Sequence, residues 1–289
     1  MTRQILFAAV LTVISGCLSA QQENFSSGDP VTVVTWNMRY NNPDDGQNAW
    51  PNRKAAFLRI LKDEKPDIFG LQEALYDQVQ DVEKAFPRFK RVGVGREDGN
   101  TKGEFAVIFY DTVKFRSLSS GNFWLSQTPF VPGSMGWDAA CTRIVTWTQL
   151  QRKNGGAELF VFNTHFDHIG QVARRNSAWL LLHAVDSLAG KRPAIITGDF
   201  NAQPGSEPVS ILTGKNNPIH FINSSDIAGV ADSASFTYAG FKPGEIQGEI
   251  IDYIFIRNIR KVSEYSVNTC HDGDYYPSDH LPVKAKVLF

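Results

Sequence analysis

The chain has 289 residues, of which 42% are hydrophobic and 20% are charged, and its formal net charge is −1. This length and composition suit one globular α/β domain with a large buried core. Proteins that hold long nucleic acids through their phosphates usually carry an excess of Lys and Arg. The overall charge therefore does not favour that class and leaves only a local basic patch for it.

The N-terminus has the pattern of a signal peptide. Arg3 supplies a positive charge, and residues 5–14 form an uncharged apolar stretch that is too short to cross a bilayer. Residues 14–17 resemble the cleavage box of a bacterial lipoprotein, in which Cys17 becomes the lipidated first residue; the alternative is ordinary cleavage after Ala20. We therefore expect an exported protein, periplasmic or at the cell surface, which is anchored to a membrane through Cys17 or is otherwise secreted.

After the predicted signal peptide (residues 1–20) and a polar leader (residues 21–29), we expect residues 30–289 to form one domain. Apolar and β-branched runs predict strands at residues 31–36, 67–71, 89–94, 104–110, 143–150, 158–163, 194–197, 250–256, 261–267 and 282–289. Helical spacing of apolar side chains predicts helices at residues 52–64, 76–86 and 171–188. Because helices and strands do not alternate regularly, an α/β architecture with mixed sheets is favoured over a simple parallel sheet or barrel.

Two features lie outside these elements. Residues 119–141 contain Gly, Pro and large aromatic residues without a clear period, so we expect a long surface loop that shapes a binding cleft. Cys141 and Cys270 are the cysteines that remain if Cys17 is lipidated. Export would permit a disulfide between them, and the alternative is two buried thiols.

Polar side chains follow the first predicted strands. Asn37 ends one strand with an amide oxygen, and Glu73 follows the next apolar strand with a carboxylate. Oxygen ligands of this kind suit Mg²⁺, which typically takes one or two carboxylates together with water and substrate phosphate. Taken alone, Asn37 would equally fit a turn and Glu73 a helix start.

A denser polar cluster follows the strand at residues 158–163. His165, Asp167 and His168 lie within four positions of one another, which is unusual for residues that serve only the core. A histidine titrates near neutral pH and suits proton transfer, so this cluster indicates a catalytic or binding site more strongly than a structural role.

Two further segments complete the candidate site. Asp199 and Asn201 follow a buried strand at i and i+2, where extended backbone points both side chains to one face; the alternative is an Asx turn. Asp252 lies inside an apolar strand, where a carboxylate is costly without a partner. His280, next to Asp279, is the expected partner of Asp252, which would orient the imidazole and favour its charged form.

These motifs occur in one order along the chain: Trp-Asn, Gln-Glu, Asn-Thr-His, Gly-Asp-Phe-Asn, Ile-Asp-Tyr and Ser-Asp-His. The ordered set resembles the endonuclease/exonuclease/phosphatase superfamily, the DNase I-like proteins, over essentially the whole chain after the leader. The resemblance implies a four-layer α/β (α+β) sandwich, with two mixed β-sheets packed face to face and helices on both outer sides.

The resemblance also implies a metal site and a catalytic group. Glu73 matches the principal Mg²⁺ ligand, with Asn37 beside it and Asp279 near the metal; Mn²⁺ is the alternative ion. Asp199 matches the residue that orients or deprotonates the attacking water, which Asn201 helps to position. The remaining matches are Asp252, which would hold His280; His280, which would contact the scissile phosphate; and His165, at a position for phosphate contact or leaving-group protonation.

Three more side chains are candidates for substrate binding. Arg39 and Arg143 suit phosphate because a guanidinium offers two donors, and the alternative for each is a surface salt bridge. His168 lies in the same dense polar cluster as His165, and Arg174 fits a helix start equally well.

The predicted function is hydrolysis of a phosphodiester or phosphomonoester by metal-assisted, in-line attack of water. The partner is a phosphoester substrate: a small molecule, a lipid head group or a nucleic acid. No protein partner is inferred. The alternatives are an extracellular nuclease and, from another class, a non-catalytic surface lipoprotein that binds a phosphorylated ligand.

Overall fold

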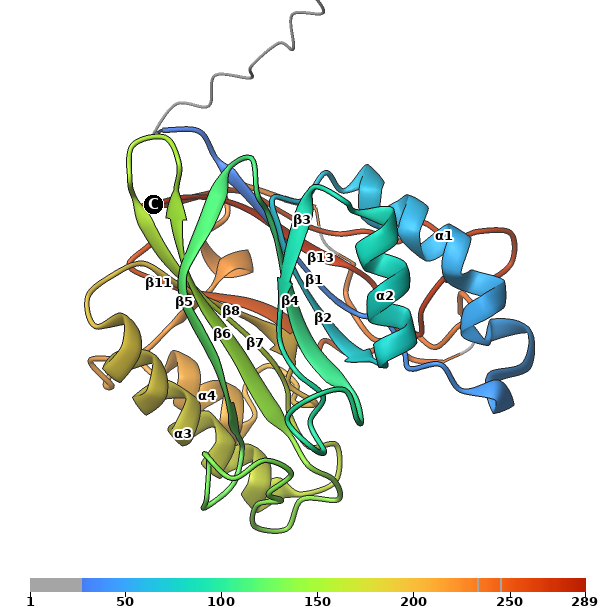
Figure 1. Cartoon of the computed structure of the whole chain (residues 1–289), viewed down its shortest axis with the longest axis horizontal. Helices are drawn as coiled ribbons and strands as arrows, with labels where there is room; N and C mark the ends of the chain where they lie inside the picture. Colours follow the sequence, from blue (N-terminus) through green and yellow to red (C-terminus); the bar gives the residue numbers. More distant parts are fainter. Residues whose placement is uncertain (1–27, 233, 245) are drawn as a thin grey trace, which may run out of the picture.

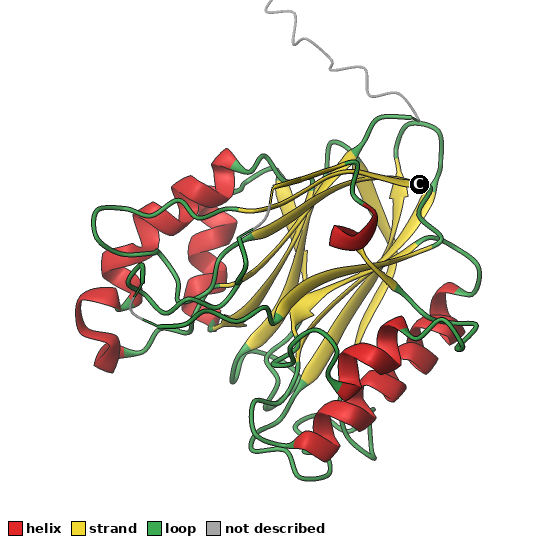
Figure 2. Ribbon diagram, turned by 180° about the vertical axis from the view of Figure 1, so that it is seen from behind, coloured by secondary structure: helices red, strands yellow, loops and turns green. Residues whose placement is uncertain are grey.

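Two β-sheets packed face to face form the centre of the molecule, and helices cover both outer sides (Figures 1 and 2). This computed structural model describes residues 28–232, 234–244 and 246–289. The predicted signal peptide, including Cys17, lies outside the described residues. Within them, no helix combines the length and the apolar character needed to cross a bilayer.

The first sheet has seven strands in the spatial order β10-β12-β13-β1-β2-β4-β3. In chain order they are β1 (Val31–Asn37), β2 (Ile68–Ala74), β3 (Phe89–Val92), β4 (Phe105–Asp111), β10 (Val230–Asp232), β12 (Lys261–Val267) and β13 (Val283–Leu288). The pairs β1–β2 and β10–β12 are parallel and the other neighbours are antiparallel, so the sheet is mixed.

The second sheet has six strands in the order β5-β6-β7-β8-β11-β9. They are β5 (Phe115–Trp124), β6 (Ile144–Arg152), β7 (Glu158–His165), β8 (Ala194–Asp199), β9 (Ile222–Asn223) and β11 (Asp252–Arg257). Only β7 and β8 pair in parallel, so this sheet is mixed as well.

Four α-helices form the outer layers of the described chain. The first sheet is covered by α1 (Trp50–Asp63) and α2 (Tyr76–Ala85), and the second by α3 (Gln171–Ala189) and α4 (Glu207–Thr213). Short 3-10 turns lie at η1 (Pro43–Asn48) and η2 (Ser224–Ile227). Gly190 follows the last residue of α3, and its positive φ of 56° suits a residue without a Cβ.

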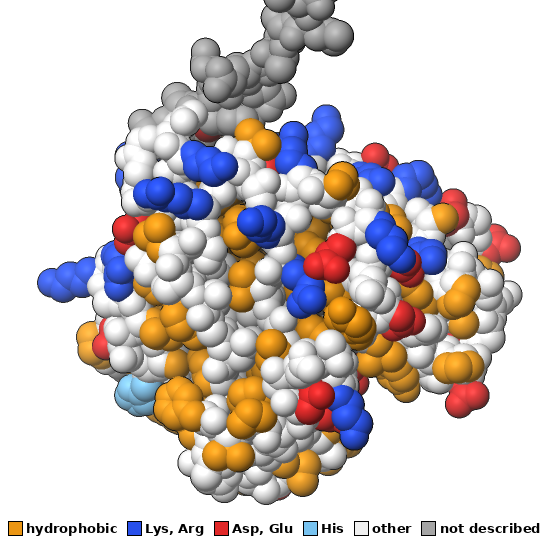
Figure 3. Space-filling view, viewed as in Figure 1, with side chains coloured by type: hydrophobic (Ala, Val, Ile, Leu, Met, Phe, Trp, Pro, Cys, Tyr) orange, Lys and Arg blue, Asp and Glu red, His pale blue; other side chains and the backbone are white. Residues whose placement is uncertain are grey.

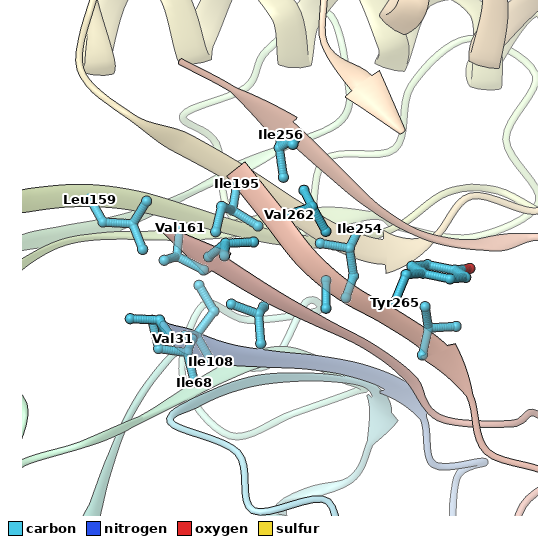
Figure 4. Close-up of a cluster of buried hydrophobic side chains, with 14 of the residues drawn as sticks. Val31, Ile68, Ile108, Leu159, Val161, Ile195, Ile254, Ile256, Val262 and Tyr265 are labelled. Atoms are coloured by element: carbon cyan, nitrogen blue, oxygen red, sulfur yellow. The ribbon is translucent and has the colours of Figure 1, made fainter. Parts of the chain in front are cut away.

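The space between the sheets is filled mainly by branched apolar side chains, together with aromatic rings such as that of Tyr265 (Figure 4). Val31 and Val33 of β1 face this space, whereas Val34 and Trp36 face α1, because successive side chains of a strand point to opposite faces. Both faces of each sheet are therefore buried over much of their length, which explains the nearly continuous apolar runs in the sequence.

One polar group crosses the apolar space between the sheets. The Asn163 amide of β7 donates to backbone carbonyls of β2 and β4, at 2.9 Å each. Its oxygen accepts from Gln72 Nε2 at 2.6 Å and from Thr197 Oγ1 at 3.0 Å. A Cβ on Gly70 would lie only 2.5 Å from Thr197 Oγ1, so the close approach of the sheets here requires glycine.

The predicted fold class is confirmed by the two mixed sheets and their outer helices. The predicted loop at residues 119–141 is wrong in its first part, because β5 extends to Trp124. Strand β5 is at the sheet edge and has exposed polar residues in its middle, so pairing with β6 holds it rather than burial. Its sequence consequently lacks the apolar alternation by which the other strands were predicted.

Candidate active site

The register of neighbouring strands places three polar side chains in a row. In the second sheet, Asp199 of β8 pairs with His165 of β7 on one side and with Asp252 of β11 on the other. His165 Nε2 is 3.3 Å from Asp199 Oδ2. Residues that are separated by up to 87 positions in sequence therefore share one end of the sheet.

Asn37 joins this row to the first sheet. Its amide nitrogen lies 3.0 Å from Glu73 Oε1 and 3.0 Å from Asp199 Oδ2. Its amide oxygen accepts from the backbone N–H of Arg39 at 3.0 Å. In this arrangement Asn37 holds two carboxylates together through its nitrogen, while its oxygen, the atom expected to face a cation, is engaged by the backbone.

His280 lies against the same row. Its Nδ1 is 2.9 Å from Asp252 Oδ2 and its Nε2 is 3.7 Å from Asp199 Oδ2. The expected pairing of Asp252 with His280 is thus present. The ring of Tyr238 lies 5.0 Å from the imidazole, and the backbone oxygen of His280 accepts from Trp36 Nε1 at 2.9 Å, which fixes the residue between the two sheets.

The two histidines of the site differ in charge near neutral pH. Burial alone lowers the pKa of His280, but Asp252, Asp199 and Asp279 together outweigh burial and raise the pKa to about 10. Burial, aided by nearby arginines, lowers the pKa of His165 well below its usual value. His280 is therefore a cation and His165 a neutral ring.

Two carboxyl groups of the site hold their protons unusually strongly. Burial, together with the charge of Asp252, raises the pKa of Asp199 to about 7. Burial, with a further contribution from Glu73, raises the pKa of Asp279. Crowded, desolvated carboxyl groups of this kind are stabilised as anions when a cation binds beside them.

Three residues of the site have a strained backbone. Arg39, Glu73 and Asn201 adopt positive φ angles of 55°, 60° and 46°, each just after or at the end of a strand. This left-handed conformation is costly for a glutamate or arginine. Such strain is often found where function requires a particular side-chain direction.

One cavity of about 520 Å³ is lined by most of the predicted residues described above, namely Arg39, Glu73, His165, Asp199, Asn201, Asp279 and His280, but not by Asn37 or Asp252. The other lining residues are Tyr40, Arg96, Glu104, Cys141, Arg143, His168, Tyr238, Glu249 and Ile251. Arg96, Glu104, Tyr238 and Glu249 were not predicted as site residues. Arg96 binds Glu104 through both terminal nitrogens, at 2.6 and 2.8 Å, opposite His165, whose Nδ1 is 4.0 Å from Glu104.

A sequence model described as the endonuclease/exonuclease/phosphatase family matches residues 34–280. The chain belongs to this family. Members of the endonuclease/exonuclease/phosphatase family hydrolyse phosphoester bonds and depend on divalent metals. The predicted family is confirmed, and the coarse activity follows from it.

Solved structures of the family resemble this chain over most of its length. An endonuclease/exonuclease/phosphatase from Bacteroides vulgatus is 36% identical, with a TM-score of 0.84, over 90% of this chain and 98% of that one. A mannosyl-6-phosphatase from Bacteroides thetaiotaomicron is 35% identical, with a TM-score of 0.85, over 90% of this chain and 100% of that one. Among curated proteins, the mimivirus protein L388 is 27% identical over 81% of this chain and 90% of its own length.

The residues at this end of the sheets fit a divalent cation of the kind the family uses. Asp199, Asp252 and His280 bring ligand atoms within 4.8 Å of one another. However, the cationic ring of His280 already binds Asp252, and a protonated imidazole has no lone pair for a metal. The carboxylates of Glu73 and Asp279, which line the same cavity as Asp199, are the better oxygen donors for a hard ion.

A second group of metal-type side chains, Cys141, Asp167 and His168, fits a cation poorly. Asp167 already accepts backbone N–H donors from Gly170 at 2.7 Å and Ala140 at 3.1 Å. Arg143 contacts both Asp167 and His168, with Nε at 3.5 Å from Asp167 Oδ2 and Nη2 at 3.0 Å from His168 Nδ1. Donors and a fixed positive charge surround this group, so it suits an anion rather than a metal.

The predicted arginines have different surroundings. Arg39 is bound by Asp45 through two nitrogens, at 2.9 and 3.0 Å, and its Nη1 is 3.9 Å from Asp279. Arg143 is buried beside the cavity, which excludes the surface salt bridge that was its alternative. Arg174 lies in the first turn of α3 and donates to the backbone oxygen of Asp167 at 2.8 Å.

The two described cysteines are free thiols, so the alternative of a disulfide is not realised. Cys141 is half-buried at the cavity and Cys270 is exposed, so the alternative of two buried thiols fails for Cys270.

Proposed function

We propose that this protein is a divalent-metal-dependent phosphoesterase that hydrolyses a small phosphorylated molecule by in-line attack of water. The observation that carries this proposal is the convergence of Glu73, from the first sheet, and Asp199, from the second, on one amide nitrogen of Asn37. The cationic His280 lies beside them, facing the same cavity. Acidic oxygens for a metal and a positive group for an anionic phosphorus centre are thus held together.

Glu73 and Asp279 would hold Mg²⁺ or Mn²⁺, with Asp199 adjacent. The ion would neutralise charge that develops on the phosphoryl oxygens during hydrolysis. Glu73 is prepared for this role because its second oxygen accepts the backbone N–H of Tyr40 at 3.1 Å, which fixes the carboxylate plane.

The chain's own residues would supply the remaining chemistry. Asp199 would orient the attacking water and accept its proton, since its pKa of about 7 is suited to a base near neutral pH. Asn201 uses its amide nitrogen toward His165 and the backbone oxygen of Phe166, both at 3.0 Å, which leaves its oxygen to position water. His280, oriented by Asp252, would bind a phosphoryl oxygen as a charged donor.

His165 would act as a neutral ring that positions Asn201. Its Nε2 is 3.0 Å from the Asn201 amide nitrogen, which can only donate, so the ring proton lies on Nδ1. Nδ1 is buried and has no hydrogen-bond partner among the described residues, so contact with the phosphate or with the leaving oxygen would require the ring to move.

The cavity favours a small substrate over a polymer. Its volume of about 520 Å³ is typical of small-molecule sites. The chain has a formal net charge of −1, and positive and negative side chains are interspersed on the face shown in Figure 3. The name of the Bacteroides thetaiotaomicron mannosyl-6-phosphatase supports sugar phosphates as the first compounds to test.

The test is a screen of the purified protein with Mg²⁺ or Mn²⁺ on mannose 6-phosphate, inositol phosphates, nucleotides, sphingomyelin, RNA and DNA. We expect turnover of a small phosphoester that EDTA abolishes and that the Glu73→Gln substitution lowers by about 10²–10³. Equal activity of that variant would show a contaminating enzyme. Digestion of RNA or DNA alone would support the nuclease alternative, and metal-dependent binding without turnover of any compound would support the non-catalytic alternative.

We also propose that the protein is exported and anchored through Cys17, on the basis of the N-terminal sequence pattern. Fractionation of cells that express the natural chain and a Cys17→Ala variant tests this. We expect the natural chain in the membrane fraction and the variant in the soluble exported fraction; retention of both in the cytoplasm would refute export.

A further inference from the structure

Arg143 differs from the other arginines that line the cavity in its terminal nitrogens, because Arg96, although its Nε is also unpaired, binds a carboxylate through both of them. Arg39 is held by Asp45 and Arg96 by Glu104, each through two guanidinium nitrogens. The Arg143 side chain is only 5% exposed, yet its Nη1 has no hydrogen-bond partner among the described residues. A buried guanidinium with an unused donor is costly unless an anion completes its coordination.

His168 presents a second donor beside Arg143. Arg143 Nη2 lies 3.0 Å from His168 Nδ1. Because a guanidinium has no acceptor, Nδ1 must accept, and the ring proton therefore lies on Nε2. His168 is exposed and lines the cavity, so its Nε2–H is available to a ligand. Together the two side chains offer N–H donors and one fixed positive charge.

Asp167 fixes this donor pair in place. Its Oδ2 lies 3.5 Å from Arg143 Nε, and its Oδ1 accepts the backbone N–H groups of Ile169 and Gly170 at 2.9 and 2.7 Å. Burial alone raises the pKa of Asp167, but the backbone donors outweigh it and lower the pKa to about 2, so the carboxylate stays ionised. Arg143 is thus held against the cavity wall before any ligand binds, which reduces the entropy lost on binding.

The pair lines the same cavity as the reaction site. Arg143 and His165 also line a second, small pocket, and His165 Nε2 is 3.3 Å from Asp199 Oδ2. A phosphoryl group that binds at Asp199 and His280 therefore lies in the open cavity that Arg143 and His168 line.

We propose that Arg143 and His168 bind terminal oxygens of the substrate phosphate and thereby select phosphomonoesters over phosphodiesters. A monoester phosphate carries about −1.5 to −2 charges near pH 7 and three terminal oxygens. Esterification of a second oxygen removes one charge and one terminal acceptor, so a diester cannot use the full set of donors. This inference rests on the proposed phosphoesterase function and specifies its substrate class.

The test compares p-nitrophenyl phosphate with bis-p-nitrophenyl phosphate for the natural protein and for Arg143→Gln, His168→Gln and the matched control Arg116→Gln. Arg116 is exposed on β5 and pairs with Gln151, outside the cavity. Loss of a charged hydrogen bond should lower kcat/KM on the monoester about 100-fold in Arg143→Gln and about tenfold in His168→Gln. On the diester each variant should lose less than about fivefold, and the control should change neither value.

An equal loss on both substrates, or no loss on the monoester, would overturn the proposal. If Arg143→Gln does not fold, the exposed His168→Gln variant decides the question. If the natural protein turns over neither of these compounds nor any compound of the substrate screen, the proposed function fails, but calorimetry with metal and either orthophosphate or dimethyl phosphate still tests the inference. We then expect the natural protein to prefer orthophosphate and Arg143→Gln to lose that preference; equal binding of both ligands by the natural protein would refute it.

Discussion

Replacing Asn163 by alanine should weaken both the fold and the site, because this side chain joins the two sheets directly below the candidate metal ligands. Its amide donates to backbone oxygens of β2 and β4, and its oxygen accepts from Gln72 and Thr197. Strand β2 carries Glu73 and β7 carries His165, so the same group sets the spacing of the two halves of the cavity.

The magnitude follows from the hydrogen bonds that are lost. A typical hydrogen bond contributes about 0.5–1.5 kcal/mol to stability. Gln72 keeps Thr35 and Thr197 keeps the Phe162 carbonyl as partners, so neither becomes fully unpaired. Four lost bonds then lower the free energy of unfolding by about 3 kcal/mol, which for a domain of this size lowers Tm by roughly 10 °C. Relaxation between the sheets by about 1 Å would lower kcat/KM by roughly 100-fold.

Urea unfolding followed by tryptophan fluorescence measures the stability change, and initial rates with metal measure the activity change. The matched control is Asn122→Ala on the edge strand β5, which removes one hydrogen bond, from Thr146 at 2.9 Å, and should cost about 1 kcal/mol without affecting turnover. Equal destabilisation by the two substitutions, or full activity of Asn163→Ala, would refute the argument that a polar contact between the sheets aligns the site.

Three further predictions concern charge at the site. Glu73→Gln keeps the side-chain shape but should weaken Mg²⁺ binding in calorimetry and lower kcat by about 10²–10³. Mg²⁺ affinity should rise between pH 6 and 8, because Asp199, next to the proposed ligands, has a pKa of about 7 in the metal-free protein and attracts a cation in its ionised form. Asp252→Asn removes the carboxylate that raises the pKa of His280 to about 10, so NMR titration should show a lower imidazole pKa. As the pH is raised, the variant should therefore lose activity at a lower pH than the natural protein does.

The Asp252–His280 pair also has a defined effect on stability. Because the folded-state pKa of His280 is raised, the pair stabilises the protein fully below the unfolded value of 6.5 and loses that effect as the pH rises toward 10. The difference in unfolding free energy between the natural protein and Asp252→Asn should therefore narrow over this range. If the difference in unfolding free energy did not change with pH, the charge assigned to His280 would be wrong. If the Mg²⁺ affinity did not change with pH, the charge assigned to Asp199 would be wrong.

Much of the site was predictable because several of its residues end an apolar strand. Asn37, His165 and Asp199 each occupy the last position of a buried strand, and Glu73 the next to last. Side chains that end neighbouring parallel strands meet at one edge of a sheet. A polar residue at the end of an apolar run is therefore predicted to lie at that edge.

Two of the missed residues, Glu104 and Glu249, reach the cavity at the start of a strand rather than at its end. Strand β4 runs antiparallel to β2 and β11 runs antiparallel to β8, so the residues before those strands reach the same edge. Glu104 and Glu249 precede β4 and β11 in this way. Their positions could be inferred only with the strand order known, and the sequence pattern does not specify which strands are neighbours.

The orientation of the Asn37 amide was also beyond prediction. The motif identifies an amide next to a carboxylate but does not determine which end faces it. Here the backbone N–H of Arg39, brought close by its left-handed conformation, occupies the oxygen and turns the nitrogen toward Glu73 and Asp199.

The left-handed backbone at Glu73 is strain that the hydrogen bonds of its own side chain offset. A non-glycine residue in this conformation costs about 1–2 kcal/mol. Glu73 accepts hydrogen bonds from Asn37 and from the backbone N–H of Tyr40, and a hydrogen bond to a charged group contributes about 1.5–3 kcal/mol. A glycine at this position would relieve the strain but lose both bonds, so heat resistance and turnover are not in conflict at Glu73.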